Sequence, residues 1–229
     1  MKIVYEDEWL IVVEKPHGLL SMSSGRAGEE TAYTMLNEYV RNEGRGQRIF
    51  IVHRLDRDTS GLLVFAKDED TKYALQKNWA EVVLERKYTA ILEGEINDDE
   101  GWIETWLYEN PKSMKVHCYA PRPGDSPDSP PMKDWKYASS HCRRVNSGET
   151  EGQRYTIVEF ELETGRKNQI RAHAEWIGHP IAGDRKYGAK TDPFKRLALH
   201  AHALTFIHPW TGKTMSFTSS LPGCFKKIH

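Results

Sequence analysis

The densest group of polar side chains in the sequence is the segment His53–Gly61, which reads HRLDRDTSG. It lies between two apolar runs of strand length, 49–52 and 62–66, and loops held by flanking strands often carry catalytic groups. A carboxylate that is shielded from water and faces a cation stays ionised, so it can serve as a nucleophile or a base. A solvated turn with weak surface ion pairs fits the same composition.

A second polar group runs from Thr164 to His173. We expect a helix over 166–177, because Ile170, Ala174 and Ile177 would share one of its faces. Arg166 and Lys167 would then stand in the first turn, where positive charge opposes the helix dipole. A bound phosphate or a carboxylate partner would offset that cost. An amphipathic helix with a solvated basic face explains the pattern equally well.

Histidines raise the question of a metal site. In a strand over 198–207, His200 and His202 would share one face, and His173 could add a third imidazole. No H-E-x-x-H motif or carboxylate-rich frame accompanies them. We therefore expect histidines that are buried in a sheet or lie at its surface, and no metal. A P-loop nucleotide site is excluded, because the sequence has no G-x-x-x-x-G-K-[S/T] motif.

Composition limits the class of protein further. Lys and Arg number 32 against 33 Asp and Glu, so the protein does not hold nucleic acid by bulk charge alone. Three cysteines without a C-x-x-C pair argue against a disulfide framework and against a cysteine zinc site. No apolar run approaches the ~18 residues of a membrane span, and Glu6, Asp7 and Glu8 interrupt the first one. We expect a cytoplasmic protein.

The elements that must position these groups alternate between strands and helices, which predicts a mixed α and β architecture in a single domain, residues 1–229. Strands are expected at 2–5, 10–14, 49–52, 62–66, 87–92, 155–163, 198–207 and 214–218. Helices are expected at 31–41, closed by Gly44 and Gly46, at 166–177, and after a cap at Asp70 or Thr71. Six of the eleven prolines fall within 111–131, which predicts a loop or insertion at about 111–146.

Several ordered motifs together resemble the RluA-type family of RNA pseudouridine synthases, from about residue 3 to about residue 218. The matching segments are Val13–Leu19, His53–Asp56 followed by Thr59–Leu63 and Ala66-Lys67, Lys87–Ala90 with Gly94, Thr164–Arg171, Gly178–Ile181, Gly183-Asp184 and Tyr187-Gly188. The resemblance implies a pseudouridine synthase-like catalytic domain of α+β class. Its mixed, largely antiparallel sheet is flanked by helices and loops, with an active-site cleft over the sheet.

The resemblance also implies roles for single residues. Asp56 matches the catalytic carboxylate, Tyr88 the tyrosine that stacks on the target uracil, and Arg171 the arginine that pairs with the catalytic aspartate. Arg54 would enter the RNA where the flipped base departed, and Ile170 would form an apolar wall of the base pocket. The further RNA- or base-binding positions are Lys15, His53, Thr59, Arg166 and Gln169.

One position departs from the family's usual pattern G-R-x-H-Q-[I/L]-R, because Asn168 stands in place of the histidine. Asparagine keeps a hydrogen-bonding side chain but does not titrate near neutral pH. An acid–base role is thus excluded at this position, and a structural role or an RNA contact stays open. Since the catalytic motifs begin almost at Met1, we expect no S4-like RNA-binding domain before them.

The implied function is the isomerisation of uridines in structured RNA, either tRNA or large-subunit rRNA, without cofactor or metal. We expect a monomer with no obligate protein partner. The alternatives are a non-catalytic RNA-binding or RNA-chaperone module on the same fold and, with little support, a histidine-metal hydrolase. Either an extra RNA contact or a flexible insertion explains the basic residues Lys112, Lys115, Lys133, Lys136, Arg143 and Arg144. Basic residues gather at 53–57, 112–144 and 166–171, which predicts one positive cleft on an otherwise acidic surface.

Overall fold

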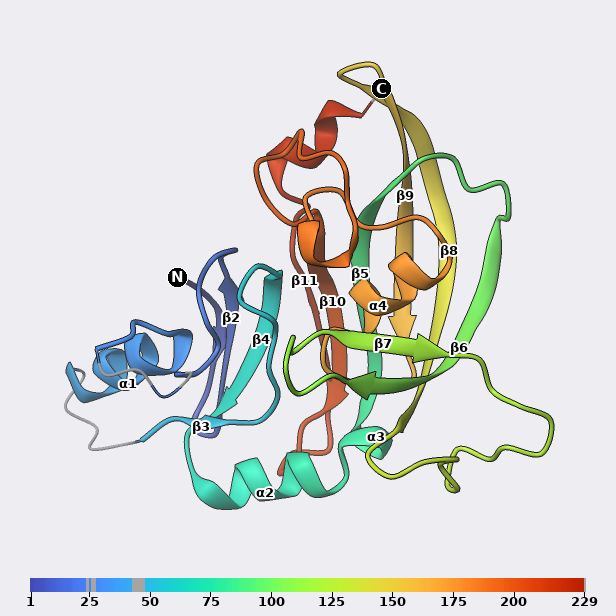
Figure 1. Ribbon diagram of the computed structural model, residues 1–229. Helices are drawn as coiled ribbons and strands as arrows, with labels where there is room; N and C mark the ends of the chain where they lie inside the picture. The colour runs from blue at the N-terminus through green and yellow to red at the C-terminus, as the bar shows by residue number, and fades with distance from the viewer. Residues whose placement is uncertain (24, 26–27, 43–47, 229) are drawn as a thin grey trace. The chain divides into compact units, whose positions relative to one another are not determined.

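A computed structural model describes residues 1–23, 25, 28–42 and 48–228 (Figure 1). The chain divides into two compact units. Unit 1 comprises Met1–Arg86 and His200–Ser220, and unit 2 comprises Lys87–Leu199 and Leu221–His229. Strands β5 (Val83–Glu93) and β10 (Leu199–Ile207) run from one unit into the other. The single domain and the cleft over the sheet stay predictions.

The sheet of unit 1 has the order β1–β2–β4–β10, with β3 beside β4 and β11 beside β10. Its strands are β1 (Lys2–Glu6), β2 (Leu10–Lys15), β3 (Phe50–Ile51), β4 (Ser60–Ala66), β10, and β11 (Thr214–Thr218). Every pairing is antiparallel except that of β4 with β10. All seven residues of β4 are buried, as expected for a central strand covered on both faces.

The described residues of unit 1 form the helices α1 (Ala32–Asn42), α2 (Glu69–Lys77) and α3 (Trp79–Val82). The predicted cap of α2 at Asp70 or Thr71 was wrong, because Asp68 is the N-cap. Its carboxylate accepts hydrogen bonds from the Thr71 backbone N–H at 2.7 Å and from the Thr71 hydroxyl at 2.6 Å. The stop that was predicted for α1 at Gly44 and Gly46 lies outside the described residues.

The sheet of unit 2 has the order β5–β9–β8–β6–β7, and all of its pairings are antiparallel. Its further strands are β6 (Glu100–Glu109), β7 (Val116–Tyr119), β8 (Lys136–Thr150) and β9 (Gln153–Leu162). Helix α4 (Gln169–Trp176) places Ile170 and Ala174 in the hydrophobic core formed with β5 and β9. Two short 3₁₀ helices follow, η1 (Arg185–Tyr187) and η2 (Gly223–Lys227). The prediction of an α+β fold with a mixed, largely antiparallel sheet is confirmed.

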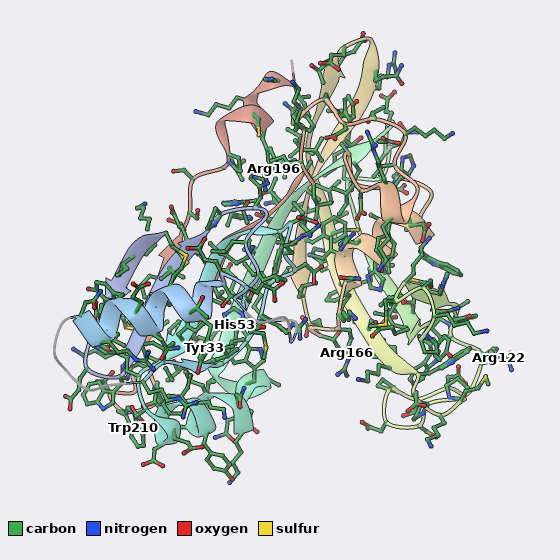
Figure 2. All side chains as sticks on the ribbon, turned by 60° about the vertical axis from the view of Figure 1, so that its left-hand side comes forward. Tyr33, His53, Arg122, Arg166, Arg196 and Trp210 are labelled. Carbon is green, nitrogen blue, oxygen red and sulfur yellow. The ribbon has the colours of Figure 1, made fainter. Side chains whose placement is uncertain are left out.

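Two predictions about unit 2 need correction. Helix α4 begins at Gln169, so Arg166 and Lys167 lie in the preceding turn, and Lys167 has a carboxylate partner in Glu109. The irregular segment predicted over 111–146 is shorter, because β7 and the start of β8 occupy parts of it. What remains between them is the segment 120–135, at whose outer side Arg122 lies (Figure 2).

Segment 120–135 is tied to the sheet of unit 2 at two points. The Trp106 indole N–H donates to the Asp125 carboxylate at 3.0 Å. The rings of Tyr119 and Trp135 stack with centroids 4.3 Å apart. One contact holds the segment at Asp125 and the other at its last residue, Trp135, so the proline-rich stretch is anchored to β6 and β7.

His173 is a fully buried residue of α4, and its two ring nitrogens hydrogen-bond to the hydroxyls of Ser140 and Thr105, each at 3.0 Å. Burial lowers the pKa of its imidazole to about 4, below the ordinary 6.5. The unfolded chain therefore takes up this proton at a higher pH than the folded protein does.

We predict that the free energy of unfolding is highest above pH 6.5 and falls as the pH drops toward 4, since protonation of His173 favours the unfolded state. His173→Gln should reduce the slope of this fall by about one proton. Urea unfolding at a series of pH values measures the slope. An equal slope in the variant and the wild type would contradict the assignment.

Candidate active site

Asp56 lies in the loop 53–59 of unit 1, which joins β3 to β4. Leu55 is buried, and both its backbone groups bond to the Ser21 hydroxyl: its N–H donates at 3.1 Å and its carbonyl accepts at 2.7 Å. This contact anchors the middle of the loop. On either side of it, Arg54 is exposed and Asp56 is half-buried. The sequence thus places a carboxylate and a guanidinium beside one buried anchor residue.

Lys15, at the end of β2, joins this loop to the segment that follows β2. Its side chain is buried, and its ammonium donates to the carbonyls of Pro16 at 2.9 Å, Leu19 at 2.7 Å and Arg57 at 2.9 Å. An ammonium has three N–H donors, and these three carbonyls match that number. The placement favours a loop-holding role, and the RNA contact of Lys15 stays a prediction.

His53 and Gly61 hold the two ends of the loop. The His53 Nε2 atom accepts the Val64 backbone N–H at 3.1 Å, so this nitrogen carries no proton. Burial, with a smaller effect of the Arg86 charge, lowers the pKa of His53 to about 3. Figure 2 labels this residue, whose ring lies 4.9 Å from that of Trp79. Gly61 has φ +120°, and a Cβ there would come within 2.1 Å of the Ala201 carbonyl oxygen.

Thr59, another predicted RNA contact, closes the turn after Asp56. It is buried, and its backbone N–H donates to the Asp56 carbonyl at 3.2 Å. The structure therefore brings Lys15, His53, Arg54, Asp56 and Thr59 together around one loop of unit 1.

The remaining predicted residues lie in unit 2, on β5 and around the start of α4. Tyr88 stands opposite Phe160 in the sheet and packs against the core that contains Ile170. Arg166 lies in the turn before α4 (Figure 2) and donates from Nε to the Tyr137 carbonyl at 3.0 Å.

The Gln169 side chain is buried, and its amide is hydrogen-bonded on both sides. Its oxygen accepts from the Thr164 hydroxyl at 2.8 Å and from the Arg166 N–H at 2.9 Å. Its nitrogen donates to Ser139 and Ser140. Gln169 thus shapes the turn that carries Arg166.

Arg171 makes a side-on ion pair within unit 2 that sequence reasoning missed. Its Nε and Nη2 atoms donate to the two oxygens of Asp184 at 2.6 Å and 2.7 Å. The side chain of Asp184 is only 2% exposed and that of Arg171 12%, so the pair is shielded from water. The segment Gly183-Asp184, one of the matching motifs, was the available signal for this partner.

The part of the chain that the structure describes contains no group of three or more His, Cys, Asp or Glu side chains placed to hold a metal ion. Both ring nitrogens of His200 hydrogen-bond to hydroxyls: Nδ1 to that of Ser60 at 2.7 Å and Nε2 to that of Ser219 at 3.1 Å. Over the same residues, no helix combines the length and the apolar character that crossing a membrane requires.

The family model for RNA pseudouridylate synthases matches residues 9–176, more than half of the chain. The chain belongs to the RNA pseudouridylate synthase family. It is 31% identical to tRNA pseudouridine synthase C of Salmonella typhi over 100% of this chain and 88% of that protein. It is 32% identical to ribosomal large subunit pseudouridine synthase D of Zymomonas mobilis, over 97% and 69% of the two chains.

A solved structure supports the architecture. Human RNA pseudouridylate synthase domain containing 4 matches with a TM-score of 0.77 over 99% of this chain and 90% of its own, at 23% identity. The fold is therefore that of pseudouridylate synthase domains. Family membership makes the protein an isomerase that acts on RNA, and it favours an enzyme over the non-catalytic module.

We predict that Lys15→Met lowers the free energy of unfolding by about 3 kcal/mol, because it leaves three part-buried carbonyls without their donor. Urea unfolding measures this change. Lys2→Met is the control: its side chain is 69% exposed in an ion pair with Glu14, so the change should stay within about 0.5 kcal/mol. Equal stability of Lys15→Met and the wild type would contradict the loop-holding role.

Proposed function

We propose that the protein converts specific uridines of structured RNA to pseudouridine, with Asp56 as the catalytic carboxylate. The observation that carries this proposal is the loop 53–59, in which a half-buried carboxylate follows a buried anchor residue in the matching family motif. The RNA is tRNA or large-subunit rRNA, since the relatives carry those two names. We further propose that the enzyme works in the cytoplasm as a monomer, without cofactor or metal.

The target base must first leave its stack, because the reaction breaks the N1–C1′ bond and rejoins the ribose to C5. Flipping a base out of structured RNA costs a few kcal/mol. Stacking on the ring of Tyr88 returns ~1–3 kcal/mol of that cost. Arg54 is exposed on the loop of Asp56, where it can fill the gap left by the base and contact phosphates.

At the chemical step, Asp56 attacks C1′ or removes the 2′ proton to give a glycal. Both routes require an ionised carboxylate, and a guanidinium partner favours the ionised form. We propose that Arg171 supplies this positive charge. Ile170 lies in the core next to Arg171 along α4 and offers an apolar wall for the uracil.

RNA binding also needs contacts beyond the flipped base. In unit 2, a groove of about 360 Å³ lies beside the turn before α4, with Lys136, Arg166 and Lys167 in its lining. Glu109 and Asp134 also line it, and Glu109 pairs with Lys167. We propose that Lys136 and Arg166 contact the phosphate backbone of the substrate, because cations in a groove attract RNA and set its register.

We predict that Asp56→Ala abolishes pseudouridine formation while RNA binding persists, since the carboxylate does chemistry and does not carry the affinity. The readout is single-turnover release of tritium from RNA labelled at uridine C5. Asp58→Ala is the control, because this neighbouring carboxylate pairs with exposed Arg57. Turnover by Asp56→Ala at the rate of the control would remove Asp56 from the catalytic role.

A second prediction concerns the groove. The double variant Lys136→Glu/Arg166→Glu should weaken RNA binding about tenfold and reduce the log–log salt slope of the affinity by about two. Its KM should rise more than its kcat falls. Filter binding at several salt concentrations measures the slope. Lys226→Glu/Lys227→Glu, at two exposed positions on η2, is the charge-matched control, and a slope change of the same size there would argue against the groove.

A further inference from the structure

Arg171 is held in unit 2 by more than its ion pair. The guanidinium carbon lies 4.8 Å from the ring centroid of Tyr187, which is fully buried. Asn168 approaches the guanidinium on another side, with its side-chain oxygen 3.4 Å from Nη1. Asp184 hydrogen-bonds to the Nε and Nη2 edge of the guanidinium, the Tyr187 ring lies against one of its faces, and Asn168 lies near Nη1. Such a set of contacts leaves the guanidinium plane little freedom to turn.

The Tyr187 hydroxyl joins three elements around this group. It accepts the Val116 backbone N–H from β7 and the Asn168 side-chain N–H from the N-cap of α4, each at 3.1 Å. Tyr187 itself belongs to η1. The ring that supports the guanidinium is therefore fixed at its far end to both a strand and a helix.

Asn168 suits this place for two reasons. Its backbone has φ 51°, a left-handed conformation that asparagine adopts more readily than most residues. Its amide carries a donor and an acceptor, so it bonds to Tyr187 and Arg171 at the same time. This double contact gives the asparagine that replaces the family histidine a structural role.

Backbone hydrogen bonds also fix the position of Asp184. Its N–H donates to the Ile181 carbonyl at 2.9 Å, and its own carbonyl accepts from Tyr187 at 2.9 Å and Ala189 at 3.1 Å. The carboxylate thus projects from a closed turn toward α4. A flexible arginine that meets a preset carboxylate loses its rotamer freedom on folding, before any substrate binds.

Stability alone is a weak explanation for this arrangement. Taking two charges out of water is costly, and replacing a buried ion pair with apolar residues is often neutral or stabilising. A buried pair is useful where a charged group must stand at a fixed place. Arg171 is such a group if it serves the reaction.

We propose that Asp184 is a positioning residue for the reaction: with Tyr187 and Asn168 it forms a clamp that holds the Arg171 guanidinium in its working orientation. This inference rests on the proposed function, in which Arg171 supplies the positive charge. Asp184 itself does not touch the uridine. Its loss should therefore lower the rate of the chemical step and leave RNA affinity almost unchanged.

The test compares Asp184→Asn with Asp192→Asn, a carboxylate that accepts the Arg196 backbone N–H at 2.9 Å. The probe is bulk RNA that is labelled with tritium at uridine C5 and comes from a strain lacking the enzyme. We expect Asp184→Asn to react about tenfold or more slowly in single turnover, with an RNA Kd within about twofold of the wild type. Asp192→Asn should react like the wild type.

A double-variant cycle separates positioning from general damage. In an Arg171→Ala background, Asp184→Asn should change the rate by less than about twofold, because it acts through the missing arginine. An equal loss in both backgrounds, or a loss confined to RNA affinity, would overturn the clamp. Tyr187→Phe is a milder second variant, which keeps the ring and removes the hydroxyl. It should also slow the reaction at unchanged Kd, and an unchanged rate would count against the clamp.

The same experiment distinguishes this inference from the proposed function. No tritium release by the wild type would contradict the proposed function, and the role of Asp184 with it. Normal release by the wild type together with an unaffected Asp184→Asn contradicts the positioning role alone.

Discussion

The buried ion pair between Arg171 and Asp184 is the interaction on which the arrangement of unit 2 depends most. A guanidinium and a carboxylate that are both shielded from water must meet at close range, or the cost of burying them is not offset. The turn at Asp184, the aromatic face of Tyr187 and the left-handed N-cap Asn168 all meet this requirement. The contacts of Asn168, Asp184 and Tyr187 thus surround one positive charge, that of Arg171.

In unit 1, a negatively charged group, the Asp56 carboxylate, is also held in a fixed place. Asp56 is half-buried in a loop. If this loop became ordered only on binding, the loss of its conformational entropy would reduce the affinity for RNA. Lys15 and Ser21 hold this loop, Lys15 through the Arg57 carbonyl and Ser21 through Leu55. In both units the group proposed to do chemistry is held by buried polar contacts. Selectivity can then depend on the RNA that reaches it.

Some regular elements were predictable, because alternation marks strands such as β9 and because residues 62–66 of β4 are a continuous apolar run. Strands β6, β7 and β8 were not predicted. Helix boundaries that depend on a single residue were not predicted. The start of α4 depends on the left-handed Asn168, and the cap of α2 on Asp68, which periodicity does not reveal. The predicted loop at 111–146 was too long, because prolines mark only its irregular middle.

Contacts between distant side chains were the hardest to foresee. Lys15 has the charge of an RNA-binding residue, yet its ammonium is buried against three carbonyls. Asp184 lies thirteen residues beyond Arg171, and nothing in their spacing predicts a pair. Charge and motif position indicate which residues matter in such cases. Only the folded chain shows which neighbour each residue uses.

The proposed function requires that this chain makes pseudouridine and that Asp56 is essential for the reaction. The most direct measurement maps pseudouridines across total RNA, by carbodiimide labelling and reverse-transcription stops, in a strain without the gene. One such strain is restored with the wild-type gene and another with Asp56→Ala. We expect one or more sites in tRNA or large-subunit rRNA to disappear and to return only with the wild type. A map that is unchanged by the deletion, or a site that Asp56→Ala restores, would contradict the account.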